Sequence, residues 1–509
     1  MYVRKKLSFF VLFLCCIFIE YSTCVEANTA FTHEEWVDFA LNKLEVTGLT
    51  EGIFSSSKPH KCSDIINLLI NIRQKIESGE IRPSPLELEI IKKLEREFDF
   101  DKKENKPRLK IYLFGEADYE SEWVTRSVSL WSAGYYKPIQ GLELYEEIEI
   151  ARDKEITGQE GETASRRTNY WEWNYTADFK RAYINMQKGP FEVLFGRDHL
   201  YWGPGSNGSL IISDNSPAFD MIMLKAEFGV IQFLAFSAML DKMWAEHGNP
   251  PTRYLANRYL SGHRMDWLVN KRLQLGLSEV VLYGGDNRGI ELQYLNPLIP
   301  YYATQWNSTT IRRDDNVLTC ADFALRPFDG IKIYGQFLVD DFSYSGGDPH
   351  ALGYIGGIYF SDLMDFSGID LMTEYTRIDS WTYTHLEQDK QYTHYGWIIG
   401  HELGPDAEQM LIKSIMIYNP DARLETLYKY SREGSRKVAD RFKGEDYKNI
   451  NFPSGNVQSK HIIGIRVLWE KLYGQRLDIS LNYIIQSQGS DRTNENEINF
   501  EIGLAFGIK

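Results

Sequence analysis

The chain has 509 residues, of which 43% are hydrophobic and 14% aromatic, with 31 Tyr and 39 Gly. This composition is typical of a folded, strand-rich protein and excludes an intrinsically disordered one. The formal net charge of −15 argues against nucleic acid as a partner, because the phosphate backbone attracts basic surfaces.

The start of the chain has the three regions of a secretory signal. Residues 4–6 are basic, residues 7–19 form an apolar run, and a polar stretch ends at Ala27. The apolar run is shorter than the roughly 18 residues that a membrane-crossing helix needs. We therefore expect residues 1–27 to be a signal peptide that exports the chain. A lipoprotein signal ending at Cys24 is an alternative, but the residues before Cys24 do not match the usual pattern.

Residues 28–104 are predicted to form a small periplasmic bundle of helices. The first helix begins after Thr32, which is placed as an N-cap, and ends at Gly48. Apolar residues at helical spacing over residues 65–76 indicate a second helix, which ends near Gly79. The sequence Ser84-Pro85-Leu86-Glu87 starts a third helix, with a capping box and proline at the first helical position.

Beyond Pro107 the hydrophobic period changes from helical to two. In the last segment, alternate residues from Phe500 to Ile508 are apolar and their neighbours are small or polar. The same alternation occurs in the segments Phe191 to Phe195, Ile290 to Tyr294 and Leu477 to Ile485. No apolar stretch after the signal is long enough for a spanning helix, so a chain that crosses a membrane must do so as a closed barrel.

We therefore predict an all-β, antiparallel transmembrane barrel over residues 105–509, with a soluble β-sandwich as the less favoured alternative. About 400 residues allow on the order of 18 strands. Aromatic residues near the expected strand ends fit the girdles at the membrane surfaces. They are Tyr301, Tyr302, Trp381, Tyr383, Tyr392, Tyr395 and Trp397. The two cysteines beyond the signal, Cys62 and Cys320, are expected to be free or buried, since two distant cysteines form no disulfide framework.

Three motifs suggest enzyme chemistry but lack the context that it needs. Residues 203–208 match G-x-G-x-x-G, but no helix follows to bind a pyrophosphate, so a tight glycine-rich turn is predicted instead. His401-Glu402 lacks the second histidine of a zinc-protease helix. The carboxylate pairs at residues 314–315 and 340–341 are adjacent, and neighbours on a strand point to opposite faces. No catalytic residue, cofactor or metal is therefore expected.

Two segments combine aromatic and charged side chains in a way that suits carbohydrate recognition. They are residues 197–202, with Arg197, Tyr201 and Trp202, and residues 263–267, with Arg264, Asp266 and Trp267. Sugar rings stack on aromatic planes, and their hydroxyls bind charged groups. From the residues alone, an arrangement with girdle aromatics and paired charges in the lumen is favoured over a sugar site.

The chain resembles the Wzi-type outer-membrane capsule-assembly proteins. The resemblance is carried by motifs in the same order over roughly residues 105–509, and the helical unit before them is also similar. The motifs are Phe195-Gly196-Arg197, Tyr201-Trp202-Gly203-Pro204-Gly205, Gly262-His263-Arg264 through Trp267, Gly276-Leu277-Ser278-Glu279, Tyr294-Leu295-Asn296-Pro297, Tyr334-Gly335-Gln336-Phe337 with Asp340-Asp341, and His401 to Asp406.

This resemblance implies an outer-membrane lectin that binds capsular or other exported polysaccharide and helps attach it to the cell surface, without catalysis. Outer-membrane lipid and a polysaccharide export channel are the other implied partners. The residues expected to contact the carbohydrate are Arg197, Tyr201, Trp202, Arg264, Asp266 and Trp267. The rival functions are a porin or transporter whose lumen conducts solutes and a secreted carbohydrate-active enzyme. The sequence leaves open whether the helices plug the barrel or lie beneath it.

Overall fold

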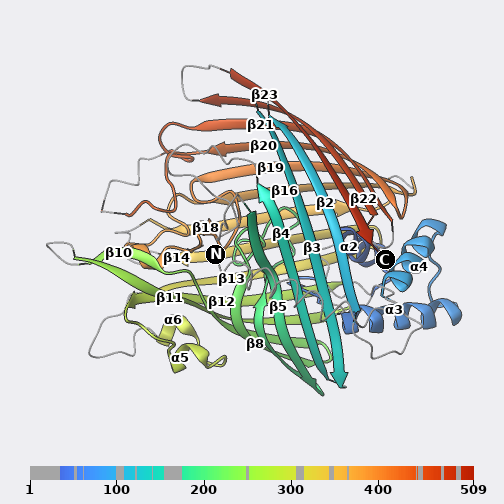
Figure 1. The fold of residues 1–509 in the computed structure, drawn as a ribbon, viewed down its shortest axis with the longest axis horizontal. Helices are drawn as coiled ribbons and strands as arrows, with labels where there is room; N and C mark the ends of the chain where they lie inside the picture. Colours follow the sequence, from blue (N-terminus) through green and yellow to red (C-terminus); the bar gives the residue numbers. More distant parts are fainter. Residues whose placement is uncertain are drawn as a thin grey trace, which may run out of the picture.

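A computed structural model gives the fold of most of the chain (Figure 1). The described residues are 35–50, 54–60, 62–98, 108–120, 123–139, 141–153, 175–247, 252–304, 315–342, 349–363, 366–442, 444, 451–471, 475–488 and 494–508. The predicted signal peptide, the Thr32 cap and the boundary at residues 104–105 lie outside these residues.

Eighteen of the described strands close into one antiparallel ring. The large sheet has 19 strands, and β10 (Met243–His247) is an addition at the rim that pairs with β11. The others follow one another in chain order, and the last strand pairs with the first, Phe506 lying opposite Leu113. The ring strands are β2 (Arg108–Glu120), β3 (Trp123–Ile139), β4 (Leu142–Asp153), β5 (Tyr175–Lys188), β6 (Phe191–Asp198), β8 (Phe219–Phe228), β9 (Ile231–Met239), β11 (Thr252–Asn270), β12 (Leu273–Asp286), β13 (Asn316–Phe328), β14 (Ile331–Asp341), β15 (Ala351–Phe360), β16 (Ile369–Ile378), β19 (Ala407–Asn419), β20 (Ala422–Glu433), β21 (Gln458–Lys471), β22 (Gln475–Gln488) and β23 (Asn494–Ile508). This ring confirms the predicted barrel and its strand number.

The two faces of each strand differ as the alternating pattern predicts. In β6, the outward residues Phe191 and Phe195 are 52% and 64% exposed, whereas Glu192 and Leu194 face the lumen and are buried. The same alternation occurs in β19, where Met410, Ile412, Met416 and Tyr418 face outward. An apolar outer face and a polar or filled interior are what a lipid-embedded barrel requires.

The two ends of the barrel differ in the length of their connections. Short turns, such as residues 189–190 and 271–272, lie at one end, and long connections, such as residues 379–406 and 434–457, lie at the other. Outer-membrane barrels have short periplasmic turns and long extracellular loops. We therefore assign the short-turn end to the periplasm.

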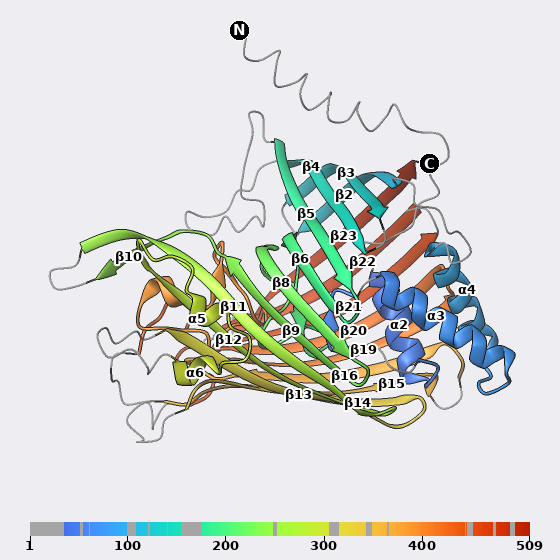
Figure 2. The same cartoon turned by 90° about the horizontal axis from the view of Figure 1, so that it is seen from below.

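Three helices lie at the periplasmic end (Figures 1 and 2). They are α2 (Glu35–Val46), α3 (Cys62–Glu77) and α4 (Pro85–Glu97). The predicted capping box is present, since the Glu87 amide donates to Ser84 Oγ and the Ser84 amide to the Glu87 carboxylate. Gly48 and Gly79 follow α2 and α3 at φ of 84° and 75°, a conformation that favours glycine at a helix end. Among the described helices, none has both the length and the apolar character needed to cross a bilayer.

The helices form their own apolar core and are held to the barrel by buried charges. The core includes Trp36, Leu44, Leu69 and Leu94. On α2, the fully buried ammonium of Lys43 lies 2.9 Å from the Asp370 carboxylate and 2.7 Å from Ser361 Oγ, on the inner side of the barrel end. These contacts show that α2 closes part of the periplasmic opening of the lumen.

Two expectations about the strands and the girdle are wrong. Residues 290–294 form a loop and the start of α5 (Leu292–Leu295), not a strand. Tyr294 packs on the barrel while Ile290 and Leu292 stay exposed, so the three apolar residues do not share one face as they would in a strand. The following Pro297 and Pro300 lack the amide that a strand donates.

The second error concerns aromatic residues that were expected in the girdle. Tyr383 and Tyr392 have no exposed surface and belong to the apolar core of the lumen. Trp381 is also buried. The sequence could not separate these positions from girdle positions, because a loop that folds into the lumen also begins at a strand end.

Lys43 provides a test of how the helices are held. Replacing Lys43 with Met leaves the buried Asp370 carboxylate without its cation, which costs roughly 3–5 kcal/mol. We expect amide hydrogen exchange in α2 to become on the order of 100-fold faster or more. The matched control is Lys92→Met, an exposed lysine on α4, for which protection should not change. Equal protection of α2 in both variants would contradict this anchoring role.

Candidate functional site

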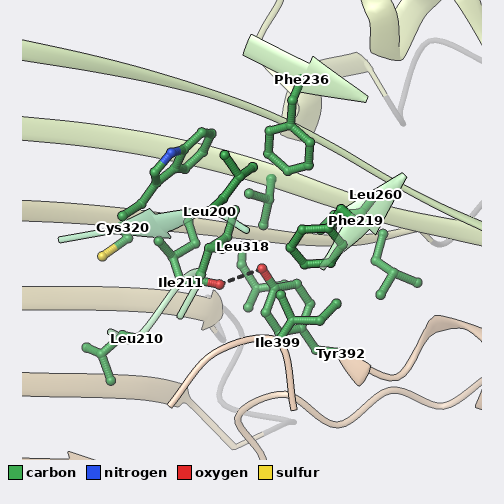
Figure 3. Close-up of a cluster of buried hydrophobic side chains, with 14 of the residues drawn as sticks. Leu200, Leu210, Ile211, Phe219, Phe236, Leu260, Leu318, Cys320, Tyr392 and Ile399 are labelled. Atoms are coloured by element: carbon green, nitrogen blue, oxygen red, sulfur yellow. Dashed lines mark hydrogen bonds between the residues drawn. The ribbon is translucent and has the colours of Figure 1, made fainter. Parts of the chain in front are cut away.

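The lumen of the barrel is filled by a loop between β6 and β8. This first inward loop, residues 199–218, contains the short strand β7 (Tyr201–Trp202), which pairs with β1 (Ser57–Lys58) and forms a bridge to Ile212. Its apolar residues pack against inward-facing residues of the strands, and Leu210 and Ile211 belong to the same buried cluster as Leu318, which Figure 3 draws. Trp202 is fully buried in this core, edge-on to Phe236.

A second inward loop, residues 379–406, packs on the first from the extracellular side. It contains η3 (Gln388–Lys390), β17 (Thr393–His394) and β18 (Trp397–Ile398). The Tyr392 hydroxyl donates to the Ile211 carbonyl at 2.6 Å, the contact drawn in Figure 3, and the Tyr383 hydroxyl donates to the Leu210 carbonyl at 2.5 Å. The two loops therefore form one plug, and the helices are not its main component.

Polar side chains of the barrel wall hold both loops by their backbones. The Gln336 side chain accepts from the Leu210 amide and donates to the Trp202 carbonyl. The Glu374 carboxylate accepts the Ser206 and Asn207 amides at 2.7 and 3.2 Å. On the other side, the fully buried Arg258 donates to three carbonyls of the second loop. They belong to Asp389, Gln391 and Thr393.

The glycine-rich motif at residues 203–208 is a turn inside the plug, as predicted, and no helix follows it. Gly208 has φ of 128°, and a Cβ on it would lie 2.7 Å from the His401 ring. Glycine is therefore required here by close packing and by backbone conformation.

His401 is wholly buried against this turn. Among the described residues, no group of three His, Cys, Asp or Glu side chains is placed to hold a metal ion. The Nδ1 of His401 accepts the Leu403 amide, and its Nε2 has no partner among the described residues. Burial lowers the pKa of His401 to about 4, although Glu402 opposes the shift. The ring is therefore neutral at physiological pH.

Arg264 and Asp266 lie together in a buried charge cluster on the lumen side of β11. Arg264 binds Asp266 and Asp322, each at 2.6 Å, and all three side chains are almost fully buried. Ser57 also donates to Asp266. A Cβ on Gly276 would collide with this cluster, so glycine makes room for it. The cluster connects the wall to the segment after α2, and in this arrangement neither residue offers a free surface to a sugar.

The other four residues singled out in the sequence lie in different places. Arg197 faces outward, where it forms a two-bonded ion pair with Asp220. Trp267 is 43% exposed on the outer wall. Trp202 is in the plug core, and Tyr201 lines a lumen cavity. The structure thus brings Arg264 together with Asp266 and Tyr201 with Trp202, but it forms no single site from the six.

The lumen cavity that Tyr201 lines has a volume of about 590 Å³ and lies between α2, the first inward loop and the wall formed by β14, β15, β16, β19 and β20. Its lining is highly charged, with Lys58 2.6 Å from Asp38. Burial alone would raise the pKa of the Asp38 carboxyl, but Lys58 and His60 outweigh it and lower that pKa. The cavity is therefore a polar space beneath the plug.

The extracellular rim carries a set of aromatic rings that each contact a cation or a histidine. Arg377 lies 3.8 Å from the centre of the Phe452 ring, and Arg436 lies 4.5 Å from that of Trp381. The remaining pairs are Arg253 with Trp244 at 4.7 Å, Phe342 with His350 at 4.6 Å and His394 with Tyr395 at 4.6 Å. We call these five pairs the rim pairs. Sequence reasoning missed the first two, because each joins residues more than 50 positions apart.

A family model for the capsule assembly protein Wzi matches residues 107–495. Among solved structures, the chain is similar to Wzi of Escherichia coli, an outer-membrane carbohydrate-binding β-barrel involved in group 1 capsule assembly, with 17% identity over 93% of this chain and 98% of that one and a TM-score of 0.62. It is also similar to OpdK of Pseudomonas aeruginosa, with 8% identity over 79% of this chain and 99% of that one and a TM-score of 0.46. No curated protein matches it.

The buried charge cluster gives a prediction about stability. Replacing Arg264 with Met leaves Asp266 and Asp322 buried without their cation, which should lower the free energy of unfolding by roughly 3–5 kcal/mol. Urea unfolding of the purified barrel, followed by tryptophan fluorescence, measures the change. Arg272→Met is the control, since Arg272 forms an exposed ion pair with Asp329 at 3.4 Å, and should change stability by at most about 1 kcal/mol. Similar losses in the two variants would be inconsistent with a structural cluster.

His401 gives a prediction about pH. In the unfolded chain His401 has its ordinary pKa of 6.5, whereas burial lowers its pKa to about 4 in the folded chain. The unfolded state therefore binds more protons between these values, and stability should fall as pH falls from about 6.5 to about 4, by at most roughly 3 kcal/mol. His401→Asn should reduce this pH dependence in urea unfolding. An unchanged slope would show that the plug does not depend on a neutral ring.

Proposed function

Because the chain belongs to the Wzi capsule assembly family, whose model matches 107–495, we propose that it binds capsular or other exported polysaccharide and helps attach that polysaccharide to the cell surface. The chain is an outer-membrane β-barrel and not an enzyme. The observation that carries the proposal is the combination of a filled lumen with the rim pairs at the extracellular end. A ligand that arrives from outside meets aromatic planes and cations before it meets the plug.

The rim pairs suit a sugar polymer in two ways. The exposed rings of Trp244, Phe342 and Tyr395 can stack on the apolar faces of sugars. The guanidinium groups of the pairs can bind hydroxyls or the carboxylates of acidic sugars. The Arg377 side chain is 39% exposed, so it is open to the outside. Capsule chains are long, so several weak contacts along the rim would add up to useful affinity.

The six residues that the sequence singled out stay a prediction as ligand contacts. For Arg264, Asp266 and Trp202, full burial favours a role in holding the wall and the plug. Tyr201 lines the lumen cavity beneath the plug, away from the rim that an external polymer meets first. Outer-membrane lipid surrounds the barrel, and we propose a polysaccharide export channel as a further partner. The alternative of a conducting porin is disfavoured by the plug.

The rim can be tested by removing its two best-placed cations. The double variant Arg377→Ala and Arg436→Ala should weaken binding of the strain's purified capsular polysaccharide about tenfold or more, if each contact contributes about 1 kcal/mol. Cells that carry it should retain less polysaccharide at the surface.

The control for this experiment is Arg272→Ala, an arginine of similar exposure at the periplasmic end. In this control, the polysaccharide affinity and the surface retention should equal those of the unchanged chain. All proteins must first show the heat-dependent gel mobility of a folded barrel. Full affinity in the double variant, with correct folding, would reject the rim as the binding surface. Absence of any glycan affinity in the unchanged chain would reject the lectin role itself.

A further inference from the structure

The segment between β12 and β13 folds back over the outer wall of the barrel. Its described part, residues 287–304, contains α5 and α6 (Tyr301–Thr304). Figures 1 and 2 place both helices beside β11 and β12, at the end opposite α2 to α4. Tyr294 and Tyr301 pack with Tyr259 and Tyr283 in one buried cluster.

Strand register shows that this cluster lies on the outside. Tyr259 pairs with Tyr283, and further along the same two strands Met265 pairs with Leu277 on the same face. Met265 and Leu277 are 43% and 52% exposed and belong to the apolar outer wall. Arg264 is the chain neighbour of Met265 and Ser278 that of Leu277, and both face the lumen. The segment therefore covers the outer face of β11 and β12 next to the part of that face that is exposed.

The segment also covers a polar pair on this outer face. The Glu279 carboxylate accepts the amides of Tyr301 at 2.7 Å and Tyr302 at 2.9 Å, and lies 3.2 Å from His263 Nε2. A carboxylate on the lipid-facing wall would be costly if left bare. Here the backbone of α6 satisfies it and shields it.

A second set of contacts fixes the start of the segment. Arg288 binds Asp315 through two nitrogens, at 2.5 and 2.7 Å, and Glu291 at 2.9 Å. The Tyr294 hydroxyl donates to Asp315 at 2.7 Å. The segment is thus docked on the wall by buried ionic and aromatic contacts.

Its outer surface is mainly apolar and lacks exposed charge, with Gln293 and Asn296 as its exposed polar side chains. Leu292 and Leu298 are each 82% exposed, and Ile290, Leu295 and Tyr302 are also exposed. Between residues 289 and 304 the one charged residue is Glu291, which is paired with Arg288. Leucines this exposed would be unfavourable in water, yet they continue the apolar outer wall of β11 and β12 without a charged boundary.

We propose that residues 290–302 sit in the outer leaflet of the membrane, with Leu292 and Leu298 in contact with lipid acyl chains. The segment anchors the extracellular end of the barrel in the membrane. It also covers the His263 and Glu279 pair on the outer wall, so that the segment and not this pair faces the lipid. The occupant is lipid, because the surface is continuous with the lipid-facing wall and carries no complementary charge for a protein partner.

Spin labels in vesicles of phosphatidylcholine and phosphatidylglycerol test this placement. Cysteines are introduced at positions 292 and 298, one at a time, in a chain carrying Cys62→Ser and Cys320→Ala that is shown to fold by its gel mobility. Each nitroxide is then exposed to oxygen, which concentrates in lipid, and to a water-soluble nickel chelate. Labels at 292 and 298 should collide more with oxygen than with nickel.

Two further labels calibrate the measurement. A label at Leu277 on the outer wall sets the lipid value, and one at Lys437, an exposed residue of an extracellular loop with 67% of its side chain open, sets the water value. Water-like values at both 292 and 298 would overturn the proposal. So would low access to both reagents with dipolar broadening between labelled chains, which would place a second copy on this face.

Discussion

The structure depends on how the polar groups inside a closed ring of strands are satisfied. Once β23 pairs with β2, every strand has neighbours on both sides, but half of the side chains then point into the lumen. Gln336, Glu374 and Arg258 face inward and bind the backbones of the two inward loops. The wall and the plug therefore stabilise each other, and neither is complete alone.

Because the wall and the plug stabilise each other, the lumen stays filled, and this limits where an external ligand can bind. A lumen filled by buried leucines, isoleucines and tyrosines leaves no wide path through the barrel. The proposed binding of an external polymer is therefore confined to the extracellular end. There the long loops place arginines over aromatic rings. The periplasmic end is closed differently, by α2 and its buried Lys43. The two ends thus differ: helix α2 closes the periplasmic end, whereas the extracellular end carries the rim pairs.

Local patterns in the sequence predicted the elements well, because those patterns have local causes. The capping box at Ser84 and the terminal glycines set the helix ends, period-two alternation marked the strands, and the length of the chain indicated their number. What the sequence could not give was the direction in which a loop folds. Tyr383 and Tyr392 look like girdle residues, and only the long-range contacts with Leu210 and Ile211 show that they enter the lumen.

The candidate site was less predictable for the same reason. Arg264 and Trp267 are three residues apart, yet one is sealed in the lumen and the other faces outward, because side chains alternate along a strand. The pairs formed by Arg377 with Phe452 and by Arg436 with Trp381 join distant loops, and no local spacing indicates them.

The inward loops close the lumen, and single-channel recording in a planar bilayer tests this closure most directly. The purified chain should be nearly silent, while a chain in which residues 203–213 are replaced by a short glycine and serine linker should show conductance steps. Steady, open-channel steps from the unchanged chain would contradict the account.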